Sequence, residues 1–168
     1  MSMATQPCDM IVNLYAVEAA EALPEGVTID RAFAGDKRRI LAAVRTLAPN
    51  WLGEVETALC QQPPSCLIAC LNGKPVGFAC YDATAKGYFG PTGVLPAARG
   101  KHIGKALLLR TLFAMREAGY GYAIIGWAED AAPFYEKTVG ARFIEGGTPE
   151  NTVYSRMIRM RRKAGIEE

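Results

Sequence analysis

The apolar and polar positions in the first part of the chain predict a strand followed by two helices. Val27–Phe33 alternates between apolar and polar residues, which is the pattern of a half-buried strand. Asp36–Leu47 carries apolar residues at helical spacing, and Pro49 ends this helix. A second helix is expected around Leu52–Cys60, before Pro63.

The middle of the chain predicts extended structure that leads into one long helix. Cys66–Leu71 and Val76–Asp82 read as two strands, and the Asn-Gly pair between them is a strong hairpin signal. Lys86–Leu95 looks extended, although Gly90 and Pro91 invite a bulge. The remaining expected elements are a helix over Ile103–Ala118, a strand over Tyr122–Gly126, a helix over Ala131–Thr138, and strands at Met10–Val17, Ala141–Ile144 and Thr152–Met160.

These elements predict an α+β protein of one domain. Hairpins mixed with helices require a sheet of mixed direction. No repeat or linker divides the chain, so residues 10–168 are expected to form a single domain after a flexible tail over 1–9.

Composition and charge narrow the class of protein. Of 168 residues, 50% are hydrophobic and 21% charged, and the net charge is only +2. A dedicated nucleic-acid binder would show a larger basic excess, so neither a nucleic-acid nor a membrane partner is expected. The N-terminus does not resemble a secretory signal, which favours the cytoplasm. The five cysteines do not show paired metal-ligand spacing, so no metal is expected and most should be buried thiols.

One loop carries most of the chemical information. The run Arg99-Gly100-Lys101-His102-Ile103-Gly104-Lys105 leads from an extended stretch into the long helix. Unpaired N–H groups at a helix N-terminus and the helix dipole both favour a phosphate. Gly100 and Gly104 allow close approach, while Arg99, Lys101 and Lys105 supply positive charge. A Walker A loop is excluded because the two glycines enclose three residues and Ala106 replaces the required hydroxyl.

This stretch resembles the pyrophosphate loop of the GCN5-related N-acetyltransferase (GNAT) family. That loop reads Arg/Gln-x-x-Gly-x-Gly/Ala after Val-x-Pro, and this chain has Val94-Leu95-Pro96 followed by Arg99 to Gly104. His102 stands where the family usually has glycine. The resemblance implies that Arg99–Lys105 binds the pyrophosphate of acetyl-coenzyme A through Arg99, Gly100, Lys101, His102, Ile103, Gly104 and Lys105. It also implies that pantetheine lies beside the backbone of Gly93 and Val94.

A second match lies downstream. Phe134-Tyr135-Glu136-Lys137 resembles the family's Phe-Tyr-Glu-Lys helix, with Val139 as an extra residue and Ala128 where relatives often have Asn. The resemblance implies that Tyr135 is the general acid that protonates the departing thiolate. A purely structural role for this ring is the alternative.

The resemblance also implies a fold and an activity. The fold would be a GNAT-like mixed, mostly antiparallel sheet of about six to seven strands, splayed between the fourth and fifth strands and flanked by about four helices. The activity would be direct transfer of an acetyl group, in a ternary complex, to an amine of a small molecule or peptide. A non-catalytic acyl-CoA-binding or sensing module is the alternative, and a homodimer is left open.

The residues alone identify neither the general base nor the acceptor substrate. Lys86–Leu95 contains no carboxylate, and the candidates for the base are Asp82, Tyr88, Glu129 and Asp130. Trp51, Glu54, Glu56 and Trp127 are expected near the acceptor. Acidic groups there would suit an amine, although a solvated helix face explains them equally well.

Overall fold

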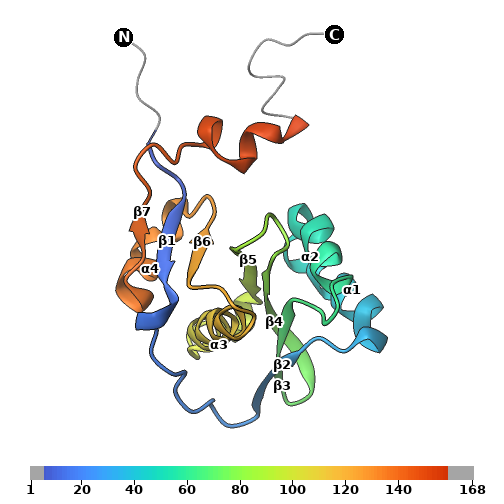
Figure 1. The fold of residues 1–168 in the computed structure, drawn as a ribbon. Coiled ribbons are helices and arrows are strands. Elements are labelled where there is room, and N and C mark those ends of the chain that lie inside the picture. The colour runs from blue at the N-terminus through green and yellow to red at the C-terminus, as the bar shows by residue number, and fades with distance from the viewer. Residues whose placement is uncertain (1–5, 159–168) are drawn as a thin grey trace.

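A seven-stranded mixed sheet forms the centre of the computed structural model, which describes residues 6–158 (Figure 1). The strand order is β2-β3-β4-β5-β6-β1-β7, and every neighbouring pair is antiparallel except β5 and β6. The strands are β1 Met10–Asn13, β2 Val27–Arg31, β3 Cys66–Leu71, β4 Lys74–Tyr81, β5 Tyr88–Val94, β6 Tyr122–Ile125 and β7 Arg142–Phe143. The predicted α+β class with a mixed sheet is confirmed.

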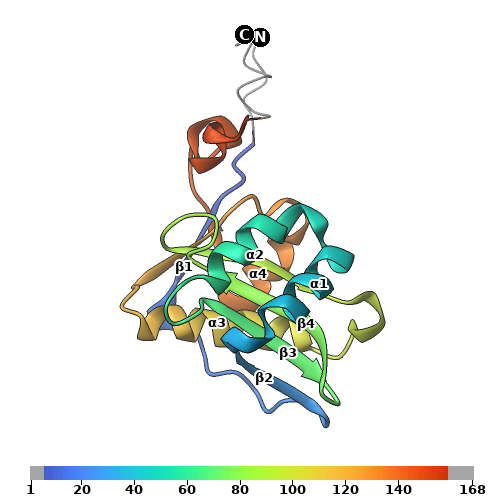
Figure 2. The same ribbon diagram turned by 90° about the vertical axis from the view of Figure 1, so that its right-hand side faces the viewer.

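Helices cover both faces of this sheet (Figure 2). They are α1 Lys37–Leu47, α2 Leu52–Leu59, α3 Ile103–Glu117 and α4 Ala132–Val139. Alternation along the strands divides the apolar residues between two cores. Phe78 and Cys80 of β4 pack with α1 and α2, whereas Ala79 and Tyr81 pack with α3. The sheet is therefore buried on both sides, which explains why its strands are largely apolar.

The long helix α3 is fixed by a fully apolar stripe. Leu107, Leu108, Leu112 and Met115 are each no more than 1% exposed. Burying a side chain of this size contributes about 1.5–3 kcal/mol. This packing fixes the helix, and with it the position of the loop that precedes its N-terminus.

Strands β5 and β6 pair over two residues only and then separate. Tyr88 lies opposite Ile124 and Phe89 opposite Ile125, and the ladder ends there. On the other side of β5, its pairing with β4 continues to Val94 after an irregularity near Gly90 and Pro91. The predicted splay and bulge are both confirmed. Counted along this chain, the splay falls between the fifth and sixth strands because β1 precedes the others.

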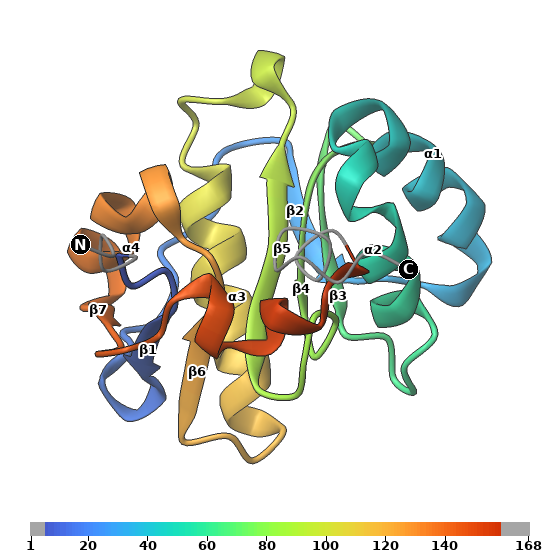
Figure 3. The same ribbon diagram turned by 90° about the horizontal axis from the view of Figure 1, so that it is seen from above.

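The predicted C-terminal strand is wrong for the residues that the structure describes. Short 3-10 turns occupy Pro149–Asn151 and Val153–Arg156 instead, and Met160 lies outside the described residues. We call residues 149–158 the C-terminal strap. Figure 3 shows it crossing from the β7 side toward α2, past the ends of β6 and β5. Strand β1 takes the place in the sheet between β6 and β7, since Met10 pairs with both Ile125 and Phe143.

The flexible tail expected over residues 1–9 differs in part from the structure. Residues 1–5 lie outside the described residues. Cys8 and Asp9, however, are 5% and 2% exposed, and the backbone N–H groups of both are bonded to the carbonyl of Gly147. These two residues therefore belong to the folded domain. Among residues 6–158, every helix is too short or too polar to serve as a membrane span.

Candidate active site

A cleft of about 1570 Å³ follows the opening between β5 and β6. Its lining comes from α2, β5, the loop before α3, the start of α3, the end of β6, α4 and the C-terminal strap. Because the two strands separate at this point, the cleft extends from the loop before α3 to the face of the sheet that α2 covers. One continuous space can therefore hold two molecules end to end.

The loop before α3 presents backbone donors that nothing else caps. Arg99 and Gly100 precede α3, His102 makes no side-chain cap bond, and the first turn carries no acidic residue. Within the described residues, the N–H groups from Gly100 to Lys105 have no acceptor outside the helix itself. Arg99 anchors the loop by donating from Nε to the carbonyl of Val94 at 3.2 Å. An uncapped N-terminus with a positive dipole end suits a pyrophosphate.

Backbone conformation explains why this loop is rich in glycine. Gly100 has φ +79°, and His102 has φ +59°, the left-handed region that favours glycine. A side chain in this region costs roughly 1–2 kcal/mol. The His102 side chain is exposed, and its backbone has the left-handed conformation that glycine adopts most readily.

The predicted cofactor-binding residues come together along one wall of the cleft. The cleft is lined by Gly93, Val94, Arg99, Gly100, His102, Ile103, Gly104 and Lys105. Lys101 is exposed in the same loop but is absent from the lining. Lys105 also reaches Glu21 at 3.5 Å, an exposed ion pair that a phosphate could replace. Beyond Phe89, no strand within residues 6–158 pairs with the β6 side of β5, and an extended ligand arm could bond there.

Tyr135 lies on the other wall, on α4. Its side chain is 7% exposed and lines the cleft, and burial raises the pKa of its hydroxyl to about 12. No hydrogen bond to this hydroxyl is formed by any residue between 6 and 158. A phenol with this pKa stays protonated at neutral pH and can act as a proton donor.

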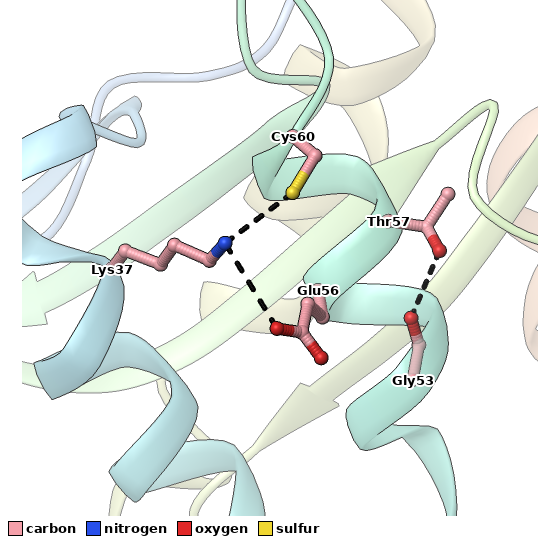
Figure 4. Close-up of polar contacts among 5 residues, drawn as sticks. All are labelled: Lys37, Gly53, Glu56, Thr57 and Cys60. Carbon is pink, nitrogen blue, oxygen red and sulfur yellow. Dashed lines mark hydrogen bonds and ion pairs between the residues drawn. The ribbon is translucent and has the colours of Figure 1, made fainter.

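The two acidic residues of α2 lie on different sides of that helix. Glu54 lines the cleft, and burial raises the pKa of its carboxyl above the ordinary value, with Thr84 acting in the opposite direction. Glu56 instead forms an ion pair with Lys37 of α1 at 3.9 Å, outside the cleft (Figure 4). Lys37 also contacts the exposed thiol of Cys60 at 3.3 Å. Of the two, only Glu54 can contact a molecule in the cleft.

The other candidate bases are less well placed. Asp82 accepts bonds from the Tyr120 hydroxyl at 2.9 Å and the Gly87 N–H at 2.7 Å, and it does not line the cleft. Glu129 lines the rim, is exposed and accepts a bond from the indole of Trp127. Asp130 is exposed and absent from the lining, while the Tyr88 hydroxyl is already bonded to Asp9.

Sequence reasoning missed a buried carboxylate behind the cleft. Asp9 accepts bonds from the Tyr88 hydroxyl at 3.0 Å, the Trp127 N–H at 3.0 Å and the Cys8 thiol at 3.4 Å. The next N–H, that of Ala128, donates to the carbonyl of Cys8 at 2.8 Å. The beginning of β1 therefore holds the turn that follows β6. No local signal marks Asp9, because its partners lie about 80 and 120 residues away in sequence.

The strap supplies a second feature that sequence reasoning missed. Tyr154 stands edge-on to Trp127, with ring centroids 4.9 Å apart. A Cβ on Gly126 would collide with the Tyr154 hydroxyl, so any other residue here would force the Tyr154 ring to move. Within residues 6–158, no three metal-ligating side chains gather in a way that could hold an ion.

A sheet divided between two parallel strands, with a basic loop and an uncapped helix at the division, is the architecture that the sequence resemblance implied. The chain belongs to the acetyltransferase (GNAT) family, whose model matches residues 32–141.

Solved structures agree on the fold. The chain is similar to a GCN5-related N-acetyltransferase from Sphaerobacter thermophilus, with 23% identity and a TM-score of 0.64 over 84% of this chain and 50% of that one. It is also similar to a GCN5-related glucosamine N-acetyltransferase region in a fungal multi-domain GH3 beta-N-acetylglucosaminidase, with 13% identity and a TM-score of 0.66 over 82% of this chain and 20% of that one. A third, from Kribbella flavida, has 17% identity and a TM-score of 0.55 over 84% of this chain and 55% of that one.

At these identities the likeness shows the fold alone. The chain spans between 20% and 55% of the length of these three proteins. No curated protein sequence matches it.

Proposed function

We propose that the protein transfers an acetyl group from acetyl-coenzyme A to an amine, directly and within a ternary complex. The observation that carries this proposal is the single cleft that connects the loop before α3, Tyr135 and Glu54. It brings together an anion site, a proton donor and a partly desolvated carboxylate.

The residues present suit acetyl-coenzyme A. The uncapped N–H groups from Gly100 to Lys105 and the side chains of Arg99 and Lys105 would hold the pyrophosphate, and Lys101 adds positive charge in the same loop. The edge of β5 near Gly93 and Val94 that faces away from β4 would form backbone hydrogen bonds with the amide groups of the pantetheine arm, in the manner of an added strand. The bound thioester supplies the activated acetyl carbon.

Glu54 is the group that we assign as base. Raising its pKa brings a carboxylate closer to the value a base needs near neutral pH, so it can take a proton from an ammonium or an attacking amine. As the C–N bond forms and the C–S bond breaks, the amine loses its proton toward Glu54. The hydroxyl of Tyr135 gives its own proton to the departing sulfur.

Transfer through a cysteine is disfavoured by where the thiols lie. None of the five cysteines lines the cleft. Cys66 and Cys80 are fully buried between the sheet and α2, and the Cys66 thiol together with burial raises the pKa of Cys80 well above its ordinary value. A thiol kept protonated away from the thioester is a poor nucleophile.

Two measurements test this function. Acetyl-coenzyme A should raise the melting temperature, because a ligand at 100 times its dissociation constant stabilises the folded state by about 2.7 kcal/mol. A screen for thiol release should then find a primary amine among small amines, amino sugars and peptide N-termini that accelerates turnover. Absence of any thermal shift at millimolar acetyl-coenzyme A would overturn the proposal.

A non-catalytic acyl-CoA-binding module would give the first result without the second. That reading would be favoured if Tyr135 were directed away from the cleft. Tyr135 instead lines it, which favours the catalytic function.

A further inference from the structure

The half of the cleft on the α2 side is walled by aromatic rings. Trp51 lines it from the start of α2, is 40% exposed and packs edge-on against Phe78 at 6.4 Å. Trp127 and Tyr154 line it from the other side, and Met157 follows on the strap. Flat apolar surfaces on both walls suit a ligand with a flat apolar body.

The wall that carries Trp127 is held in a set conformation. Trp127 and Glu129 have φ values of +48° and +40°, which side-chain-bearing residues rarely adopt. Such strain persists only where the surroundings impose it, and it concentrates at functional sites. Here the buried carboxylate of Asp9 accepts the Trp127 N–H, and the indole donates to Glu129. These bonds present the ring to the cleft in one orientation.

Two carboxylates flank the space between the walls. Glu54 lies on the α2 wall, and Asp9 lies behind the opposite one. Burial, followed by the nearby charges of Asp9 and Glu54, raises the pKa of Tyr154. Burial disfavours any charge, but the two carboxylates favour a cation at the same place. Aromatic faces also attract cations.

We infer that the acceptor is a primary amine carried on an aromatic ring, with its ammonium group beside Glu54 and its ring between Trp51 and the Trp127–Tyr154 pair. This inference rests on the proposed function, because it names the acceptor of that reaction. It commits to one class: an amine with a single positive charge and a planar apolar body. Within residues 6–158, the cleft lining includes two carboxylates, Glu54 and the exposed Glu129, which is too little negative charge for a polyamine.

Binding rather than turnover gives the sharpest test. Calorimetry on the full chain saturated with coenzyme A would compare 2-phenylethylamine with three probes that each change one property. 2-Cyclohexylethylamine keeps the charge and apolar bulk but lacks the aromatic face, 2-phenylethanol lacks the charge, and glucosamine replaces the ring by a polar one. We expect 2-phenylethylamine to bind between about twofold and tenfold more tightly than its cyclohexyl analogue. It should bind at least roughly tenfold more tightly than the other two.

Two variants assign the preference to residues. Glu54→Gln should remove most of the preference for 2-phenylethylamine over 2-phenylethanol, while Glu56→Gln on the same helix should retain it. Trp51→Leu should remove the preference for the phenyl over the cyclohexyl ring. Because Trp51 is partly exposed, this change should leave the fold intact, and a retained thermal shift with acetyl-coenzyme A checks that.

The outcomes separate this inference from the proposed function. Tighter binding of glucosamine, or equal binding of the phenyl and cyclohexyl amines, would overturn the inference. Turnover of a non-aromatic amine would then still support acetyl transfer. Conversely, selective binding of 2-phenylethylamine with no thiol release would uphold the binding site and overturn the transfer.

Discussion

The ring of Tyr135 stands edge-on to the ring of Phe89, with centroids 6.2 Å apart and planes inclined at 74°. Phe89 is the last residue of β5 that pairs with β6, so this contact fixes Tyr135 at the point where the two strands separate. The ring is held by packing, the residue lines the cleft, and no residue between 6 and 158 forms a hydrogen bond to its hydroxyl. The packing role and the chemical role of this side chain can therefore be separated by removing one atom.

Replacing Tyr135 by phenylalanine should lower turnover by about 10²–10⁴-fold, the usual range for general acid catalysis. Affinity for acetyl-coenzyme A should stay nearly unchanged, because the proton is needed only as the sulfur leaves. Steady-state kinetics and calorimetry measure the two effects. The control is Tyr122→Phe, which removes a hydroxyl from a 57% exposed side chain outside the cleft. Near wild-type turnover of Tyr135→Phe would exclude this tyrosine as the acid.

The pH profile should identify Glu54. The basic form is required, so kcat/KM should fall as pH falls through the raised pKa of this carboxyl, which lies above its ordinary value of 4.5. Glu54→Gln should abolish that limb and lower kcat/KM by about 10²–10⁴-fold. Glu56→Gln should preserve both the limb and the rate, since Glu56 is paired with Lys37 outside the cleft.

The ionised form of Glu54 that activity requires should lower the stability of the folded protein. A carboxyl with a raised pKa binds its proton more tightly in the folded than in the unfolded chain. Its stabilising contribution is present below the ordinary pKa and is lost as pH rises through the folded value. Glu54→Gln should therefore keep or raise the melting temperature at pH 7. A clear decrease at that pH would contradict the direction assigned to this pKa.

His102→Gly should keep or tighten binding of acetyl-coenzyme A. The left-handed backbone at this position costs a histidine roughly 1–2 kcal/mol and costs glycine little. The free energy of unfolding should rise by up to about 1 kcal/mol, less what glycine gains in the unfolded chain. Ala97→Gly, in the preceding turn and without positive φ, should instead lower stability by about 0.5–1 kcal/mol. A large loss of affinity in calorimetry would mean that the imidazole itself contacts the ligand.

Asp9→Ala should destabilise the protein markedly. It removes the buried carboxylate that accepts from the Tyr88 hydroxyl and the Trp127 N–H, and a hydrogen bond to a charged group contributes about 1.5–3 kcal/mol. Urea unfolding measures the change. Ile11→Val, on the same strand at a 38% exposed position, should be close to neutral. Similar unfolding curves for the two variants would show that the three bonds of Asp9 contribute little.

Much of the site could be predicted because its signals are local. The Gly- and base-rich loop, the long helix and the Phe-Tyr pair each lie within a short run of residues. Their conformations follow from turn chemistry, capping and helical periodicity. The ends of the helix are predicted well for the same reason: the sequence indicates a helix over Ile103–Ala118, and α3 runs over Ile103–Glu117.

The rest depended on contacts between distant residues. The alternating pattern of Met10–Asn13 indicates a strand but cannot say which strand it joins. That β1 lies between β6 and β7 therefore could not be predicted, nor could the burial of Asp9 that follows. Residues 152–158 carry a similar pattern, yet β1 already occupies the position that a closing strand would need. The segment turns over the cleft instead, and Tyr154 becomes part of its wall.

The position of β1 also sets an order of events during synthesis. Met10 pairs with Ile125, which leaves the ribosome 115 residues later. At about 5–20 residues per second, the first strand waits roughly 6 to 23 s for its partner. The hairpin of β3 and β4 can form meanwhile, because its contacts are local. The wall that holds Trp127 is then among the last parts of the protein to be assembled, since Asp9 reaches it only when β1 docks.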